Sequence, residues 1–147
     1  MIEIKLDTEN LDKGLAKLLR NATDSRPMMS SIASELQSIT EDNFASESWG
    51  GIRWPRSKRV LNNGGQTLQK SGQLAGSIST SSGLNYARIS SSKPYAAIHH
   101  LGGNAGRNRA TKIPARPYLP IGKNRDLQKG ADTRILEIAV AALKKGL

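Results

Sequence analysis

The sequence has no cysteine among its 147 residues, which excludes disulfide bonds and cysteine-ligated zinc sites. Aromatic residues are also scarce, with one Phe, two Trp and three Tyr, and 37% of the chain is hydrophobic. This supply is enough for the core of one domain of ordinary size but thin for a large enzyme-like core. We therefore expect a single domain over residues 1–147, with long polar loops.

Long hydrophobic runs are missing too. No stretch approaches the roughly 18–20 continuous apolar residues that are needed to cross a bilayer. The N-terminal segment is amphiphilic and acidic, and it lacks the basic-then-apolar order of a signal peptide. We expect a soluble protein that is made in the cytoplasm and does not bind membranes.

Acidic residues are absent from the middle of the chain. Between Ser48 and Arg125 there is no Asp or Glu, whereas Lys and Arg number thirteen. The two flanks together carry nine basic and twelve acidic residues, so the excess in the net charge of +10 lies in the middle. This distribution favours an anionic partner, either nucleic acid or an acidic protein surface. The alternative is a solvated basic surface that only keeps the protein soluble.

Hydrophobic periodicity predicts an α+β fold, in which a small antiparallel sheet packs against two or three amphipathic helices. Alternation at Ile2, Ile4 and Leu6 predicts a short edge strand, and two alternating runs around Gly83 predict a β-hairpin. Helical spacing predicts helices at about residues 8–20, 27–44, 95–101 and 126–145. The second of these helices has an apolar stripe that we assign to the core: Met29, Ile32, Ala33, Leu36, Ile39 and Phe44.

Two segments without periodicity, residues 46–71 and 103–112, predict long basic loops that are mobile in the free protein. Trp54 is expected to cover the edge of the core. In a nucleic-acid complex, Trp54 or Tyr118 would be the aromatic residue near the basic residues that stacks on a base. No helix-turn-helix, zinc-finger or RNP signature is present, so any DNA contact would be independent of base sequence. The candidate contacts to a partner protein or to DNA phosphates are Arg53, Arg56, Lys58, Arg59, Arg107, Arg109, Lys112 and Arg116.

Signals of catalysis are weak. The only histidines, His99 and His100, are adjacent, so their side chains point in different directions and do not readily bind one metal ion. There is no phosphate-binding loop and no GxSxG nucleophile elbow. We expect no catalytic residue, metal or cofactor, with His99 packed in the fold and His100 facing solvent or a partner. The alternative is a small metal-dependent hydrolase that uses His99.

Several motifs occur in a characteristic order over residues 28–145. Trp54-Pro55 is followed by LQKSGQLAGSI, by KPYAAIHHLGG, by IPARPYLPIG and by a closing amphipathic helix. The ordered set resembles the Mu-like phage virion-morphogenesis (tail-completion) family. The family commonly has Gln-Phe where this chain has His100-Leu101, and a bulky residue in place of Ala75. The family-motif residues, which the resemblance implies are structural, are Trp54, Gly72, Leu74, Tyr95, His99, Gly102, Pro114, Arg116 and Pro117.

The resemblance implies a structural protein that finishes the tail or joins it to the head, without enzymatic activity. It also implies other tail or neck proteins as partners, a homo-oligomeric ring around the DNA channel, and a place in the host cytoplasm during assembly and then in the virion. The subunits of such a ring need two different contact faces. The edge strand and the two basic loops are candidates for these faces. The alternative function is sequence-independent nucleic-acid binding.

Overall fold

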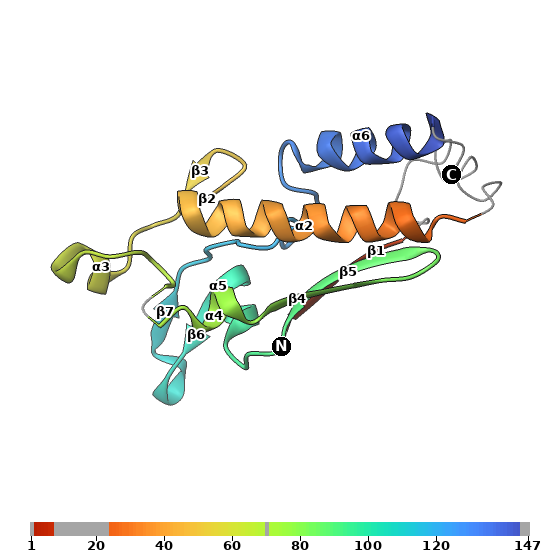
Figure 1. The fold of residues 1–147 in the computed structure, drawn as a ribbon. Helices are drawn as coiled ribbons and strands as arrows, with labels where there is room; N and C mark the ends of the chain where they lie inside the picture. The colour runs from red at the N-terminus through yellow and green to blue at the C-terminus, as the bar shows by residue number, and fades with distance from the viewer. Residues whose placement is uncertain (1, 8–23, 70, 145–147) are drawn as a thin grey trace.

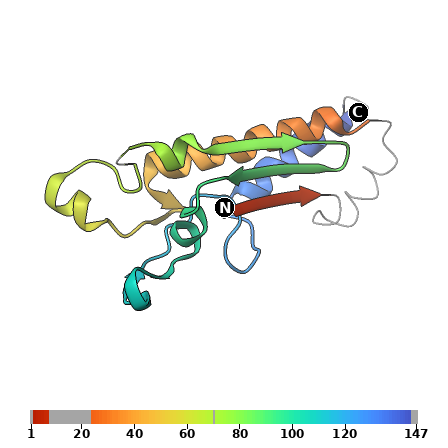
Figure 2. The same cartoon turned by 90° about the horizontal axis from the view of Figure 1, so that it is seen from below.

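The fold has an α-helical layer over one face of a small antiparallel sheet (Figures 1 and 2). The computed structural model describes residues 2–7, 24–69 and 71–144. The long helix α2 (Arg26–Ser46) lies along the sheet, and α6 (Ala131–Lys144) packs beside α2 on the same side. The α+β prediction is confirmed. The helix predicted at residues 8–20 lies outside the described residues.

The sheet has three strands in the order β1 (Ile2–Asp7), β5 (Tyr86–Ser91) and β4 (Ile78–Ser82), all antiparallel. The predicted hairpin is formed by β4 and β5, and β1 is an edge strand as predicted. Along β5, Ala87, Ile89 and Ser91 are buried and alternate with partly exposed residues. This period of two turns one face of β5 toward α2, which packs against it.

Helix α2 supplies the largest part of the core. Every residue of the predicted stripe is buried, and Met28 is buried with them. Pro27 occupies the first turn, where its missing N–H costs no helical hydrogen bond. Ser25 precedes the helix, but its hydroxyl donates to the carbonyl of Leu84 instead of capping the helix. The start of α2 is thereby tied to the turn between β4 and β5.

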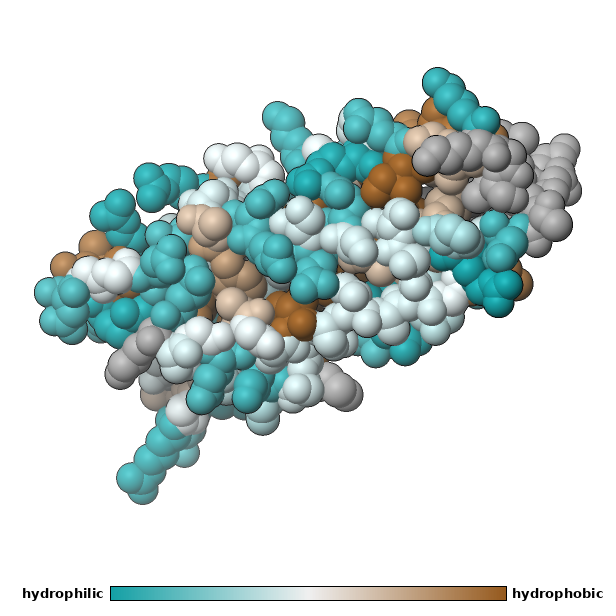
Figure 3. Space-filling view, in the orientation of Figure 1, coloured by the Kyte–Doolittle hydropathy of each residue, from teal (hydrophilic) through white to brown (hydrophobic). Residues whose placement is uncertain are grey.

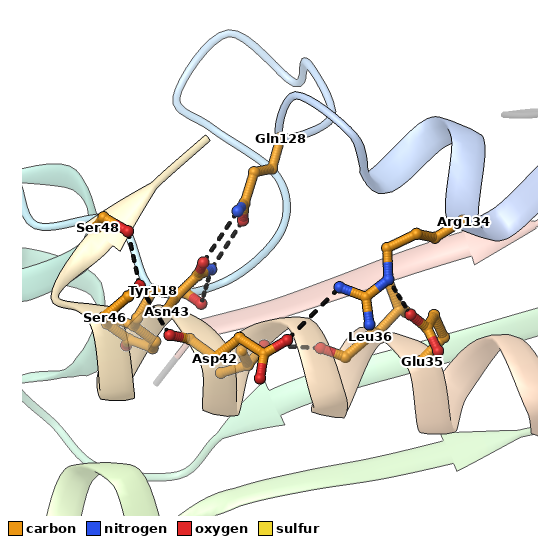
Figure 4. A network of polar contacts seen from close by, with 10 residues as sticks. Glu35, Leu36, Asp42, Asn43, Ser46, Ser48, Tyr118, Gln128 and Arg134 are labelled. Carbon is orange, nitrogen blue, oxygen red and sulfur yellow. Dashed lines mark hydrogen bonds and ion pairs between the residues drawn. The ribbon is translucent and has the colours of Figure 1, made fainter. Parts of the chain in front are cut away.

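The last helix begins later than predicted, at Ala131 instead of Asp126. The chain before it forms a loop, which is closed by a bridge between Ile121 and Leu127. Gln128 in this loop is buried and exchanges hydrogen bonds with Asn43 of α2 in both directions, at 2.7 and 2.9 Å (Figure 4). Because Gln128 is held as part of the core, the residues before Ala131 do not continue the helix.

The two predicted long basic loops are not confirmed, because both segments contain short regular elements. Residues 46–71 contain the strands β2 (Ser48–Trp49) and β3 (Ile52–Arg53) and the short helix α3 (Lys58–Asn63). Residues 103–112 contain the two-stranded hairpin β6 (Gly103–Ala105) and β7 (Thr111–Ile113), with the 3₁₀ turn η2 (Arg107–Arg109) at its tip. These strands have two or three residues each, which is too short for a period-two pattern to be recognised.

Two further short helices lie within the motif segments. Helix α4 (Gln73–Gly76) begins after Gly72, and α5 (Ala96–Leu101) ends at Gly102, which confirms the helical reading of residues 95–101. Within the described residues, no helix is both long enough and apolar enough to span a membrane.

Candidate partner-binding site

The motif segments around Trp54 and Arg116 are joined by a reciprocal pair of hydrogen bonds. The Trp54 indole Nε1 donates to the Pro117 carbonyl at 2.7 Å, and Arg116 Nε donates to the Pro55 carbonyl at 2.6 Å. Trp54 is buried and meets Phe44 edge to face, with ring centroids 5.8 Å apart. Trp54 therefore covers the core as predicted, and its ring is not free to stack on a base.

The backbone of Arg116 is also tied to α5. Its N–H donates to the His99 carbonyl at 2.8 Å, near the C-terminal end of that helix. Carbonyls at a helix end lack intrahelical partners, so this bond satisfies one of them. The segment that contains Arg116 therefore runs across the end of α5.

His100 is placed opposite to expectation: it is only 2% exposed. Its Nδ1 accepts from the backbone N–H groups of Tyr118 and Leu119, at 3.1 and 3.3 Å. Nδ1 is therefore unprotonated, so Nε2 carries the proton and donates it to the Ile121 carbonyl at 2.7 Å. Burial lowers the pKa of His100, although the bond to Ile121 opposes the shift. Residues 118–121 lie outside any helix or strand, and the neutral imidazole of His100 supplies hydrogen-bond partners for their backbone groups.

Tyr118 is wholly buried, so its predicted availability for stacking on a base is wrong. Its hydroxyl donates to the Ala96 carbonyl at 2.6 Å, and its ring contacts those of Phe44 and His100. Burial raises the pKa of Tyr118 far above its ordinary value. Tyr118 therefore packs in the core and holds α5 in position.

A pocket of about 300 Å³ opens beside these contacts, and six of its eight lining residues come from the motifs. One of them, His99, has a buried Nδ1 without a hydrogen-bond partner among the described residues. Burial lowers the pKa of His99, and the charge of Arg116 adds to this effect. The residues that line the pocket are Ser57, Arg59, Leu68, Ser71, Leu74, Tyr95, His99 and Arg116.

The eight candidate contact cations fall into two groups. Arg59 and Arg116 line the pocket, and the other six are exposed on β3, α3 and the β6–β7 hairpin, or next to these elements. Hydrophilic side chains cover and project from this end of the molecule (Figure 3). Within the described part of the chain, none of the eight forms an ion pair. The exposed six are Arg53, Arg56, Lys58, Arg107, Arg109 and Lys112.

Two motif glycines are required by the backbone. Gly102 has a φ of +74°, and a Cβ there would lie 2.8 Å from the Ala115 backbone nitrogen. Gly72 precedes α4 with a φ of +73°, a conformation that other residues adopt only with strain. The loss of either glycine would therefore shift a segment that lines the pocket.

No group of three or more His, Asp or Glu residues that could hold a metal ion occurs in the described ranges. Both ring nitrogens of His100 are engaged by backbone groups. His99 lies beside a cation instead of a carboxylate. A carboxylate, a backbone carbonyl or a water molecule normally orients an imidazole that serves as a base or as a metal ligand. Among the described residues, no carboxylate contacts either histidine.

A model of the phage virion morphogenesis family matches residues 6–144, nearly the whole chain. The chain belongs to this family. The predicted resemblance to a Mu-like virion-morphogenesis family is confirmed. Family membership gives the protein a structural role in phage assembly, among other virion proteins.

Three similar proteins come from phage Mu and from Mu-like prophages. Mu-like prophage FluMu G protein 2 of Haemophilus influenzae is 36% identical over 120 residues, which cover 81% of this chain and 83% of the relative. FluMu G protein 1 of the same organism is 31% identical, with 84% and 86% covered. Putative capsid assembly protein G of Escherichia phage Mu is 40% identical, with 53% and 48% covered. No solved structure matches.

Proposed function

We propose that this protein is a structural subunit that completes the phage tail or joins the tail to the head. Its membership in a virion morphogenesis family supports an assembly role, and the name of the phage Mu relative refers to capsid assembly. The observation that carries the proposal is the group of six exposed cations without ion-pair partners in the described chain. Such a surface suits contact with acidic faces of neighbouring virion proteins.

We further propose that the protein works as a homo-oligomeric ring. A closed ring needs two different complementary faces on each subunit. The outer edge of β1 is one candidate, because β1 pairs only with β5 within the described sheet and can accept another strand. The cationic end, formed by α3 and the β6–β7 hairpin, is the other candidate (Figure 1).

The test of the assembly role is removal of the gene from its prophage, followed by electron microscopy of the particles released on induction. We expect separate heads and tails that lack a finished head-proximal end, because a structural joint is missing. Supplying the gene from a plasmid should restore joined particles. Normal infectious particles without the gene would refute the proposal.

Sequence-independent nucleic-acid binding is the second candidate function, and the same six exposed cations favour it. The burial of Trp54 and Tyr118 speaks against stacking on bases, so binding would depend on phosphate contacts alone. Affinity for duplex DNA should then fall steeply and log-linearly with salt concentration. Lack of binding at about 50 mM salt would eliminate this function, since phosphate contacts are strong under such conditions.

A further inference from the structure

Arg116 is a buried cation without an anion. Arg116 is only 7% exposed, and burial lowers the pKa of its guanidinium. Its guanidinium makes one hydrogen bond among the described residues, from Nε to the Pro55 carbonyl, and forms no ion pair. Burying a guanidinium is costly unless a carboxylate or phosphate faces it. The remaining N–H groups of Arg116 are therefore available to an anion from outside the chain.

The rest of the pocket also offers hydrogen-bond donors. Arg59 lines it as a second guanidinium that contacts a carbonyl, that of Gln66, and no carboxylate. The Ser57 and Ser71 hydroxyl oxygens accept backbone N–H groups, so their hydrogens remain free to be donated. Among the residues that the structure describes, no Asp or Glu lines the pocket. A pocket with two guanidinium groups, two free hydroxyl donors and no carboxylate is built for an anion.

The walls of the pocket narrow the choice of anion. Leu68 and Leu74 line it together with Tyr95, which packs edge to face against His99 with ring centroids 5.8 Å apart. An apolar wall suits the methylene stem of an acidic side chain, whereas a DNA phosphate stays on the outside of a solvated backbone. The planar guanidinium also matches the two oxygens of a carboxylate.

We propose that this pocket binds a carboxylate side chain of a neighbouring virion protein, with Arg116 as the main anchor and Arg59 as the second. The bound carboxylate would neutralise Arg116 and bring the partner against three motif segments at once, those of residues 68–74, 95–99 and 116. That the partner is a virion protein rests on the function proposed above. The preference of the pocket for carboxylates does not depend on it.

In the binding test, the full chain is titrated with glutarate as the probe. Glutarate replaces chloride, so that the ionic strength stays constant. NMR signals of the Arg116 Nε–H group and of the His99 ring should shift with saturation, while those of the enclosed His100 ring should move little. R116Q should weaken glutarate binding by about tenfold or more, since it removes charge-assisted hydrogen bonds. R125Q, which removes one exposed charge outside the pocket and outside the six contact cations, is the matched control and should bind like the wild type.

Inorganic phosphate is titrated in a parallel arm. Saturation by phosphate with no response to glutarate would overturn the carboxylate assignment, and so would a lack of saturation by glutarate. If R116Q does not fold, R59Q provides the same comparison, because Arg59 is only partly buried. Equal glutarate affinity for R59Q and the wild type would remove Arg59 from the site.

R116M separates a binding role from a structural one. Replacing a buried unpaired charge by an apolar side chain of similar length removes a desolvation cost but also the hydrogen bond to the Pro55 carbonyl, so Tm should change little. The same variant should fail to complement the gene deletion, because the partner carboxylate has lost its anchor. A large fall in Tm, or full complementation, would contradict the proposal. Glutarate binding is measured on the isolated protein, so its failure is distinct from a failure of the assembly role.

Discussion

His100 joins α5 to the chain segment that crosses its end. Its two ring nitrogens contact three backbone groups, and every one of these contacts requires the neutral imidazole with its proton on Nε2. A second proton on Nδ1 would face two N–H donors at short range. The fold of this region therefore depends on the protonation state of one side chain.

The free energy of unfolding should fall as the pH is lowered from about 7 to about 5. The folded-state pKa of His100 is below that of the unfolded chain, near 6.5, so the unfolded chain binds the proton first. The stabilisation is thus complete above the unfolded pKa and decreases as pH falls through this window. Urea unfolding at both pH values measures the loss.

H100Q is the control for this pH dependence. A glutamine can accept through its oxygen and donate through its nitrogen without titrating. The variant should fold and show a smaller loss of stability between the two pH values, the remainder coming in part from His99, whose pKa is also lowered. An unchanged loss in H100Q would assign the pH dependence to other groups.

G102A tests the close approach of two backbone segments. Its Cβ would meet the Ala115 nitrogen at 2.8 Å, in a conformation with φ of +74° that alanine adopts only with strain. We expect a loss of at least about 2 kcal/mol in the free energy of unfolding. G76A is the matched control, because a Cβ there meets nothing within 4 Å, and it should be neutral or stabilising by up to about 1 kcal/mol. Similar losses in the two variants would contradict the structural role of Gly102.

At the scale of elements, α6 and the chain segment before it are attached to α2 by two kinds of polar contact (Figure 4). Asn43 donates to the Tyr118 carbonyl at 2.9 Å and exchanges hydrogen bonds with Gln128, and this network is buried. On the surface, Arg134 of α6 pairs with Glu35 and Asp42 of α2. Buried amides without partners cost more than exposed charges without partners, so the two contacts should differ in energy.

N43A should lower the free energy of unfolding by about 1–3 kcal/mol, because it leaves the buried Gln128 amide and the Tyr118 carbonyl without a partner. R134M should cost less than about 1 kcal/mol, since the Arg134 side chain is 41% exposed and its charge is screened by solvent. Thermal or urea unfolding of both variants makes the comparison. A larger loss for R134M than for N43A would show that the surface pairs determine how α6 docks.

Across the whole molecule, charge is separated. The described acidic residues lie on β1, on or beside α2, and on or just before α6, whereas the exposed cations of β3, α3 and the β6–β7 hairpin have no acid among them. The elements that carry these cations lie at one end of the elongated molecule (Figure 1). This arrangement leaves the cationic end free for a partner instead of neutralising it internally.

Neutralising the hairpin cations with R107Q/R109Q/K112Q should reduce complementation of the gene deletion by about tenfold or more, while the variant stays folded. All three residues are exposed and make no side-chain contact that the fold needs. K123Q/R125Q/K129Q removes the same charge from another exposed loop and serves as the control. Equal titres of infectious particles from the two variants would show that net charge matters and that its place does not.

The periodic elements could be predicted from the sequence. The apolar stripe of α2, the β4–β5 hairpin and the edge strand β1 were predicted correctly, because each depends on a repeat that places its apolar residues on one face. The order of the motif segments was also enough to indicate the family, which the family match confirms. These features depend on the local spacing of apolar residues and on the identity and order of the motif residues along the chain.

Only the tertiary structure decided the environment of single polar residues. His100 is buried and His99 lines the pocket, because the segment around Arg116 crosses the end of α5 and encloses one imidazole while leaving the other at an opening. The hairpin at residues 103–113 and the late start of α6 likewise depend on hydrogen bonds between distant segments, such as that of Asn43 with Gln128. Local spacing contains no information about such pairings, since burial and charge pairing arise only when distant parts of the chain meet.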